Sequence, residues 1–188
     1  NAVILRNEEP LASAGSGGAE HCAHRMLRTT FAHGCEGFFA AQRASDRDAT
    51  LARLSYVTDV AALKDCDIVI EAVTEDLELK NDLWKQLDAL CPAHTIFASN
   101  TSSLTIAAMA SATKRADRFV GLHFFNPVPL MQLVEVVRTV TTSTATFDRA
   151  LTFGKSLGKE AVAAKDNSGF IVNLLLVPYL LDAIRALE

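Results

Sequence analysis

Short apolar runs alternate along this chain with longer segments of helical periodicity. The run from Asp67 to Val73 is apolar except for two acidic residues. The segment that follows it carries apolar residues every three or four positions, at Leu77, Leu83, Trp84, Leu87 and Leu90. A β-branched run followed by a helical pattern is typical of a βαβ unit. The chain therefore belongs to the α/β class, with a mostly parallel sheet.

The same pattern predicts further elements on both sides of this unit. The expected strands are 2–5, 54–58, 95–98, 119–125, 133–137 and 161–164. The expected helices are 77–90, 105–112 and a helix around 147–157 that Gly158 closes. The stretch 11–42 is also expected to be helical, although it contains five glycines.

One long apolar helix is expected from Gly169 onward, with Pro178 inside it. Asp166, Asn167 and Ser168 precede it and are suitable helix caps. Because this helix is apolar nearly all round, it needs burial on every side. A partner chain or a second domain is expected to cover it.

Composition excludes several classes of function. The 188 residues carry a formal net charge of −4, so a broad basic surface for nucleic acid is absent. The longest apolar stretch, 170–181, is shorter than the roughly 20 residues of a membrane span. The first residues show no signal-peptide pattern, and the missing initiator Met suggests that residues precede Asn1. Four cysteines without a C-x-x-C pair favour a reducing intracellular compartment.

Polar side chains follow three of the expected strands, where ligands bind in open α/β sheets. Glu75 follows the first, the segment Ser99 to Ser103 follows the second, and His123 and Asn126 end the third. If these strand ends converge, hydroxyl, amide, carboxylate and imidazole groups share one crevice. That set is suited to acid–base chemistry on an oxygen atom.

His123 and Glu135 are twelve residues apart across an expected hairpin centred near Pro129. A hairpin with that centre places the two residues opposite each other, where the carboxylate orients the imidazole as a general base. The alternative is a histidine that caps a strand end and a glutamate in solvent. The Ser99–Ser103 segment has an alternative role as an ordinary turn, and Asn173 has one as a buried structural amide.

Two further patterns are rejected as sites. Gly15, Gly17 and Gly18 do not complete a G-x-G-x-x-G loop and lie ten residues beyond the first strand. A metal site is not expected, since no H-x-E or C-x-x-C motif supports the donors His21, Cys22, His24, His33 and Cys35.

Four motifs occur in order: SNTSSL at 99–104, GLHFFNPVP at 121–129, LVEV at 133–136 and GFIVN at 169–173. Together they resemble the L-3-hydroxyacyl-coenzyme A dehydrogenase family of fatty-acid β-oxidation. The resemblance implies a Rossmann-like NAD-binding domain over 1–166, lacking its first βα unit. It also implies that residues 167–188 begin a helical C-terminal domain, which makes the protein a homodimer where that domain is present.

The resemblance also implies roles for individual residues. His123 corresponds to the general base, Glu135 to its orienting partner, and Ser102 and Asn173 to the groups that hold the substrate oxygen. Asn126 is expected on the substrate side. The expected NAD-binding residues are Ala72, Glu75, Lys80 and Asn100. The implied reaction transfers hydride from C3 of an L-3-hydroxyacyl-CoA to NAD, giving the 3-ketoacyl-CoA.

The chain departs from this family at its beginning, where the first strand and the glycine-rich turn are absent. Two alternatives therefore stay open. One is an inactive remnant that binds acyl-CoA or a partner and has weakened affinity for NAD. The other is a sister dehydrogenase acting on 3-hydroxybutyryl-CoA or a sugar acid. The resemblance implies an intracellular location, in the mitochondrial matrix, the cytoplasm or a peroxisome.

Overall fold

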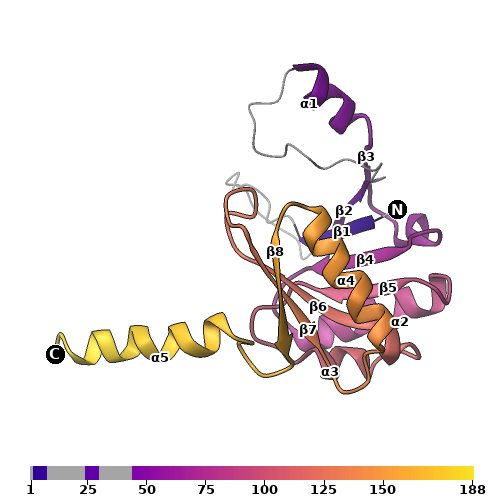
Figure 1. The fold of residues 1–188 in the computed structure, drawn as a ribbon. Helices are drawn as coiled ribbons and strands as arrows, with labels where there is room; N and C mark the ends of the chain where they lie inside the picture. Colours follow the sequence, from indigo (N-terminus) through magenta and orange to yellow (C-terminus); the bar gives the residue numbers. More distant parts are fainter. Residues whose placement is uncertain (1, 8–23, 30–43) are drawn as a thin grey trace, which may run out of the picture.

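The computed structural model describes residues 2–7, 24–29 and 44–188. Figure 1 shows a sheet with helices on its two faces and one helix that extends away from it. The strands are β1 (Ala2–Asn7), β2 (His24–Thr29), β3 (Leu54–Val57), β4 (Ile68–Ala72), β5 (Ile96–Ser99), β6 (Phe119–Phe124), β7 (Leu133–Arg138) and β8 (Glu160–Lys165). The helices are α1 (Ala44–Leu51), α2 (Leu77–Leu90), α3 (Ile106–Ala110), α4 (Thr144–Ser156) and α5 (Val172–Arg185), with 3₁₀ turns η1 (Val60–Leu63) and η2 (Ala116–Arg118).

The eight described strands form one sheet in the order β3-β2-β1-β4-β5-β6-β7-β8. The pairs β1–β4, β4–β5, β5–β6 and β7–β8 are parallel. The pairs β1–β2, β2–β3 and β6–β7 are antiparallel. The strand order on either side of β1 and β4 is that of a doubly wound sheet, whose ligands bind where the order reverses.

Alternate residues of the central strands supply two separate cores. Phe97 and Phe119 face α2 and α3, whereas Ala98 and Val120 face α4. The Trp84 ring of α2 lies 4.9 Å from the Phe97 ring and 4.7 Å from the Phe119 ring, measured between centroids. The period-2 alternation of β-strands thus explains why these strands are apolar throughout.

Helix α2 is capped at both ends by side chains. At its start, the Asp76 carboxylate accepts hydrogen bonds from the amides of Glu78 and Leu79. At its end, the Arg115 guanidinium donates to the carbonyls of Asp88 and Cys91. These contacts satisfy backbone groups that a helix leaves unpaired at its termini.

Nearly all of the expected elements are confirmed within a few residues, but one is wrong in part. Residues 24–29, expected to be helical, form β2, and the rest of the stretch 11–42 lies outside the described residues. Strand β2 pairs on both sides, with β1 and with β3. Sheet pairing supplied from distant segments overrides the weak helical pattern here. Helix α1 was not expected.

The first strand takes a central place in the sheet. Strand β1 lies beside β4 in parallel register, with Ala2 opposite Ile68 and Arg6 opposite Ala72. This pairing covers the edge of β4, whose backbone donors and acceptors would otherwise lack partners. The apolar run at the start of the chain is therefore confirmed as a strand.

Helix α5 begins at Val172, three residues later than expected, and none of its residues is buried. Its apolar side chains are exposed, among them Leu175, Tyr179 and Ile184, and Figure 1 shows the helix projecting from the sheet. The expectation that residues 166–168 cap this helix is wrong for Asp166, which binds the amides of Ile106 and Ala107 in α3. Within the described residues, no helix is long and apolar enough to cross a membrane.

We predict that Gly121→Ala destabilises the fold. A Cβ atom at Gly121 would lie 2.7 Å from the Cβ of Val137 and 2.9 Å from the Cδ1 of Ile106. Relieving this overlap must shift β7 or α3, at a cost of about 1–3 kcal/mol in the free energy of unfolding. Urea unfolding should show this loss, while Val140→Ala, at a fully exposed side chain, should leave the midpoint unchanged. Equal midpoints for both variants would contradict the packing described.

Candidate functional site

The parallel strands β4, β5 and β6 end side by side, and polar residues follow each of them. In register, Glu71 pairs with Ser99, and Ser99 pairs with Gly121. The amide of Asn100 donates to the carbonyl of Glu71 at 2.7 Å, which extends the ladder by one residue. The convergence of strand ends that the sequence predicts is therefore present.

His123 and Glu135 form the centre of this edge. They are paired directly across the antiparallel β6–β7 ladder. The Nδ1 atom of His123 lies 2.7 Å from the Oε2 atom of Glu135, and both side chains are buried. The hairpin hypothesis is confirmed, and the alternative of a glutamate in solvent is wrong.

Glu135 has a second set of partners. Its Oε1 atom accepts hydrogen bonds from the backbone amides of Ile171 at 2.9 Å and Val172 at 3.0 Å. These amides lie at the beginning of α5, where unpaired donors and the helix dipole favour a negative charge. One carboxylate thus orients the imidazole and caps the helix.

Aromatic rings enclose the imidazole on two sides. The centroid of the Phe125 ring lies 4.5 Å from that of His123, and the Phe170 centroid lies 5.5 Å away. Within the described part of the chain, the Nε2 atom of His123 makes no hydrogen bond, and it is not among the fully enclosed unpaired atoms. That nitrogen is the one available to a ligand.

The segment between β8 and α5 connects three parts of the site. Asp166 binds the start of α3, the Ser168 hydroxyl donates to the carbonyl of Ser103 at 3.0 Å, and Phe170 contacts His123. Gly169 and Phe170 both have positive φ, at 77° and 50°. A Cβ atom at Gly169 would lie 3.0 Å from the amide nitrogen of Leu174, so this reversal requires glycine.

Ser102 and Asn173 meet at this segment. The Asn173 side-chain amide donates to the carbonyl of Ser102 at 3.3 Å. The Ser102 side chain is exposed, and its hydroxyl has no hydrogen-bond partner among the described residues. The two residues therefore lie together. They are linked to His123 because Val172, the neighbour of Asn173 in the chain, donates its amide to Glu135, which in turn binds His123.

The two asparagines lie at the same edge but in different settings. The Asn100 Oδ1 atom accepts a hydrogen bond from the amide of Phe124 at 2.8 Å, next to His123 in β6. Asn126 is exposed and begins the loop between β6 and β7. Asn100 thus has a structural contact that its predicted cofactor role did not anticipate.

Glu75 organises the turn that follows β5. Its Oε1 atom accepts hydrogen bonds from the Thr101 hydroxyl, the Ser103 hydroxyl and the amides of Ser102 and Ser103. Burial by itself raises the pKa of Glu75, but the Thr101 hydroxyl, the Lys80 ammonium and the Ser102 amide outweigh burial and lower this pKa below 4.5. The segment is therefore a turn built around the Glu75 carboxylate, and its role in a site stays a prediction.

Lys80 is buried beneath Glu75. Its ammonium nitrogen lies 2.5 Å from Glu71 Oε1, 3.1 Å from the carbonyl oxygen of Val73 and 3.3 Å from Glu75 Oε2. An ammonium group has three hydrogens to donate. Two of them have hydrogen-bond acceptors in Glu71 and the Val73 carbonyl, and the ammonium also forms an ion pair with Glu75, a finding that bears on the predicted cofactor contact of this residue.

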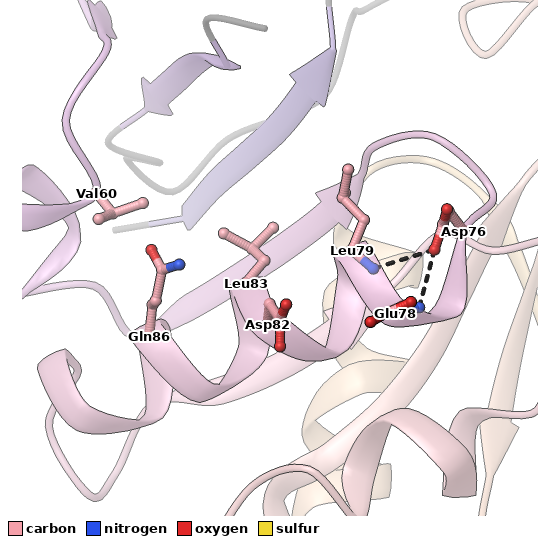
Figure 2. Close-up of a pocket in the computed structure, with 7 residues that line it drawn as sticks. All are labelled: Val60, Asp76, Glu78, Leu79, Asp82, Leu83 and Gln86. Carbon is pink, nitrogen blue, oxygen red and sulfur yellow. Dashed lines mark hydrogen bonds between the residues drawn. The ribbon is translucent and has the colours of Figure 1, made fainter. Parts of the chain in front are cut away.

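A pocket of about 440 Å³ lies elsewhere, over the outer face of α2. Figure 2 shows its lining residues, which include Asp76, Leu79 and Gln86 of α2 and Val60 of η1. None of these residues belongs to the polar set around His123. Among the described residues, no group of three or more metal-binding side chains occurs, and most of the donors at 21–35 lie outside them.

The comparisons with known proteins agree with this geometry. The family model described as "3-hydroxyacyl-CoA dehydrogenase, NAD binding domain" matches residues 18–167. The chain belongs to the 3-hydroxyacyl-CoA dehydrogenase family. It is 46% identical over 187 residues to human mitochondrial hydroxyacyl-coenzyme A dehydrogenase, covering 99% of this chain and 58% of that protein.

Solved members of the 3-hydroxyacyl-CoA dehydrogenase family have the same fold. The structure of 3-hydroxybutyryl-CoA dehydrogenase from Escherichia coli matches with a TM-score of 0.76 and 44% identity, over 78% of this chain and 31% of that one. A 3-hydroxybutyryl-CoA dehydrogenase of Mycobacterium tuberculosis is 48% identical over 145 residues, covering 76% of this chain and 51% of that protein. The chain thus spans between about a third and three fifths of these relatives.

The cofactor of this family is NAD, as the description of the matched domain states. The described residues fit such a group, because the half-buried Ala72 ends β4 and the partly exposed Glu75 follows it, beside the point where the strand order reverses. A small side chain there leaves room for a ligand, and a carboxylate suits a ribose hydroxyl. The rejected glycine loop at 15–18 lies outside the described residues.

Two buried charged residues were not singled out from the sequence. Glu71 interrupts an otherwise apolar strand, and that interruption was the available signal. Lys159 donates to the carbonyls of Val128 and Met131, at 2.5 Å and 2.7 Å, and so holds the loop after Asn126. No local sequence pattern predicts this contact, because its partners lie about thirty residues apart from it.

We predict that Glu75→Gln lowers stability at neutral pH and that the loss disappears in acid. Because the folded-state pKa of Glu75 lies below 4.5, the ionised carboxylate stabilises the fold above that pH. This contribution is lost as the pH falls from 4.5 through the folded pKa. Thermal unfolding between pH 7 and pH 3 tests this, with the exposed Glu160→Gln as the control. A Tm difference that does not change with pH would contradict the prediction.

Proposed function

We propose that the protein containing this chain is an NAD-dependent dehydrogenase that oxidises L-3-hydroxyacyl-CoA to 3-ketoacyl-CoA in fatty-acid oxidation. The observation that carries the proposal is the buried His123–Glu135 pair, in which the Nε2 atom of His123 has no hydrogen-bond partner among the described residues. Family membership supports the class of reaction. The names of the relatives support an acyl-CoA substrate.

His123 is proposed as the general base. Its Nδ1 atom is hydrogen-bonded to Glu135, which fixes the tautomer with Nε2 as the acceptor. Nε2 then takes the proton from the 3-hydroxyl, and the developing imidazolium is stabilised by the Glu135 carboxylate. NAD, when bound, accepts the hydride from C3.

Ser102, Asn173 and Asn126 are proposed to hold the substrate. The unpartnered Ser102 hydroxyl is a donor for the substrate oxygen, and the Asn173 amide lies against the same residue. Asn126 lies at the exposed start of the loop after β6. Polar groups directed at an oxygen that gains charge lower the barrier when they are fixed in advance.

Ala72, Glu75 and Asn100 are proposed to line the cofactor side of the crevice. Ala72 ends β4, Glu75 follows it, and Asn100 follows β5. Strand β4 adjoins the reversal of the strand order, and β5 lies next to β4. Lys80, also expected to contact NAD, donates hydrogen bonds to Glu71 and to the Val73 carbonyl and forms an ion pair with Glu75. We therefore assign its effect on the cofactor to its contact with Glu75.

We propose that residues 1–166 form the NAD-binding domain and that 167–188 begin a helical domain. The exposed apolar side chains of α5 support this boundary, because such a surface is normally covered. A homodimer formed through that domain is part of the proposal. The location is proposed to be intracellular, in the mitochondrial matrix if it follows that of the human relative.

The reaction is tested in reverse with the full-length protein, acetoacetyl-CoA and NADH, by following the absorbance of the reduced cofactor. Turnover supports the proposal, and a series of acyl chains then separates a 3-hydroxybutyryl-CoA enzyme from one that prefers long chains. Acyl-CoA binding without turnover would instead indicate an inactive binding protein. Sugar acids as the preferred substrates would indicate a sister dehydrogenase.

We predict that His123→Gln lowers kcat by about 10²–10⁴-fold, because a positioned general base contributes that much. Binding of NAD should hardly change, since no proposed cofactor contact involves His123. Stopped-flow kinetics and calorimetry measure the two effects separately. Equal kcat values for the variant and the parent would remove His123 from the mechanism.

We predict a different result for Glu135→Gln, which also touches α5. An amide can still accept hydrogen bonds from Ile171 and Val172, but it cannot stabilise an imidazolium by charge. We expect kcat to fall while Tm falls only slightly. Glu135→Leu, which lacks both acceptors, should lower Tm as well, because the backbone amides of Ile171 and Val172 lose their partner.

A further inference from the structure

Glu71 is a carboxylate at 0% exposure in the middle of the parallel strand β4. Its Oε1 atom accepts hydrogen bonds from Lys80 Nζ at 2.5 Å and from the Val73 amide at 2.7 Å. Its Oε2 atom accepts one from the Ser99 hydroxyl at 2.6 Å. A charge removed from water is costly unless it is fully paired, and here each oxygen has a partner.

Lys80 connects this carboxylate to a second one. The lysine is 1% exposed, and its ammonium bridges Glu71 Oε1 and Glu75 Oε2 while donating to the Val73 carbonyl. The two hydrogen bonds and the ion pair with Glu75 together hold the ammonium between the two carboxylates. Its position is therefore suited to holding Glu75 in place.

Glu75 passes this constraint to the turn after β5. While Oε2 faces Lys80, Oε1 receives the amides of Ser102 and Ser103 at 3.0 and 3.2 Å. The backbone of Ser102 is thus fixed by a carboxylate that is itself fixed by a buried ion pair. The Ser102 hydroxyl has no partner among the described residues, so its place is set by its backbone, which the Glu75 contact and the Asn173 amide help to hold.

We propose that Glu71 and Lys80 are positioning residues, which hold Glu75 and through it the Ser102 hydroxyl against the substrate. This inference rests on the proposed function for the role of Ser102, but the contacts themselves do not depend on it. A buried ion pair is a weak source of stability, because an apolar pair of similar volume often does as well. A role in placing a second carboxylate explains why charged groups occupy this position.

Kinetics and stability together test the proposal in the full-length protein. Lys80→Met leaves the buried Glu71 without a counter-charge, and Glu71→Gln leaves the buried Lys80 with Glu75 as its remaining counter-charge. Both should lower Tm, whereas the double variant should regain part of that loss. The KM for acetoacetyl-CoA should rise about tenfold to 10²-fold in all three, since small misplacements of a binding group have effects of that size. Asp88→Asn, which breaks the Asp88–Arg115 pair at the other end of α2, should lower Tm without changing KM.

Two further measurements separate positioning from general stability. In a Ser102→Ala background, Lys80→Met should cause no further rise in KM, because the group that it positions is already gone. By NMR, the amides of Ser102 and Ser103 should exchange about tenfold faster in Lys80→Met than in Asp88→Asn. The amide-exchange measurement does not require turnover. If the protein shows no turnover but the exchange rates differ as expected, the proposed function fails while the positioning inference stands.

Three results would overturn the inference. The first is recovery of both KM and Tm toward the parent values in the Glu71→Gln/Lys80→Met double variant, which would show that the rise in KM follows from lost stability. The second is an additive effect of Lys80→Met in the Ser102→Ala background. The third is unchanged amide exchange at Ser102 and Ser103, which would show that Lys80 does not hold the turn.

Discussion

The site depends on one carboxylate whose two oxygens serve different elements. Glu135 accepts from the His123 imidazole through Oε2 and from the first amides of α5 through Oε1. Burial makes both contacts obligatory, because an unpaired buried carboxylate would carry a large desolvation cost. The orientation of the His123 imidazole and the starting point of α5 are therefore set by the same group.

The polar groups around this carboxylate are held by contacts that span the sheet. Asp166 after β8 caps α3, and Glu75 after β4 holds the turn after β5. Each contact joins the end of one strand to the element that follows another. This cross-linking gives the site its rigidity, although its residues lie on loops and strand ends.

Much of this arrangement followed from the sequence, and the reason lies in its local patterns. Short apolar runs located β4 to β8, and the twelve-residue spacing located the His123–Glu135 pair, because a hairpin converts spacing directly into register. The capping of α5 by Glu135 joins residues 36 and 37 positions apart, and the Asp166 contacts join residues about sixty apart. Contacts between residues so far apart produce no periodic pattern of apolar and polar residues in the sequence. Strand β2 was missed for the same reason, since its pairing partners decide its conformation.

The segment from Asp166 to Val172 is fastened at both ends, to α3 by the aspartate and to Glu135 by the backbone of the new helix. Only a handful of residues separate these fastenings, and Gly169 and Phe170 are already in left-handed conformations. The number of residues between the two contacts therefore leaves the backbone little room to adjust. An inserted or deleted residue would rotate and shift α5 relative to the His123 imidazole. The length of this connection, as well as its composition, is therefore constrained by the geometry around His123.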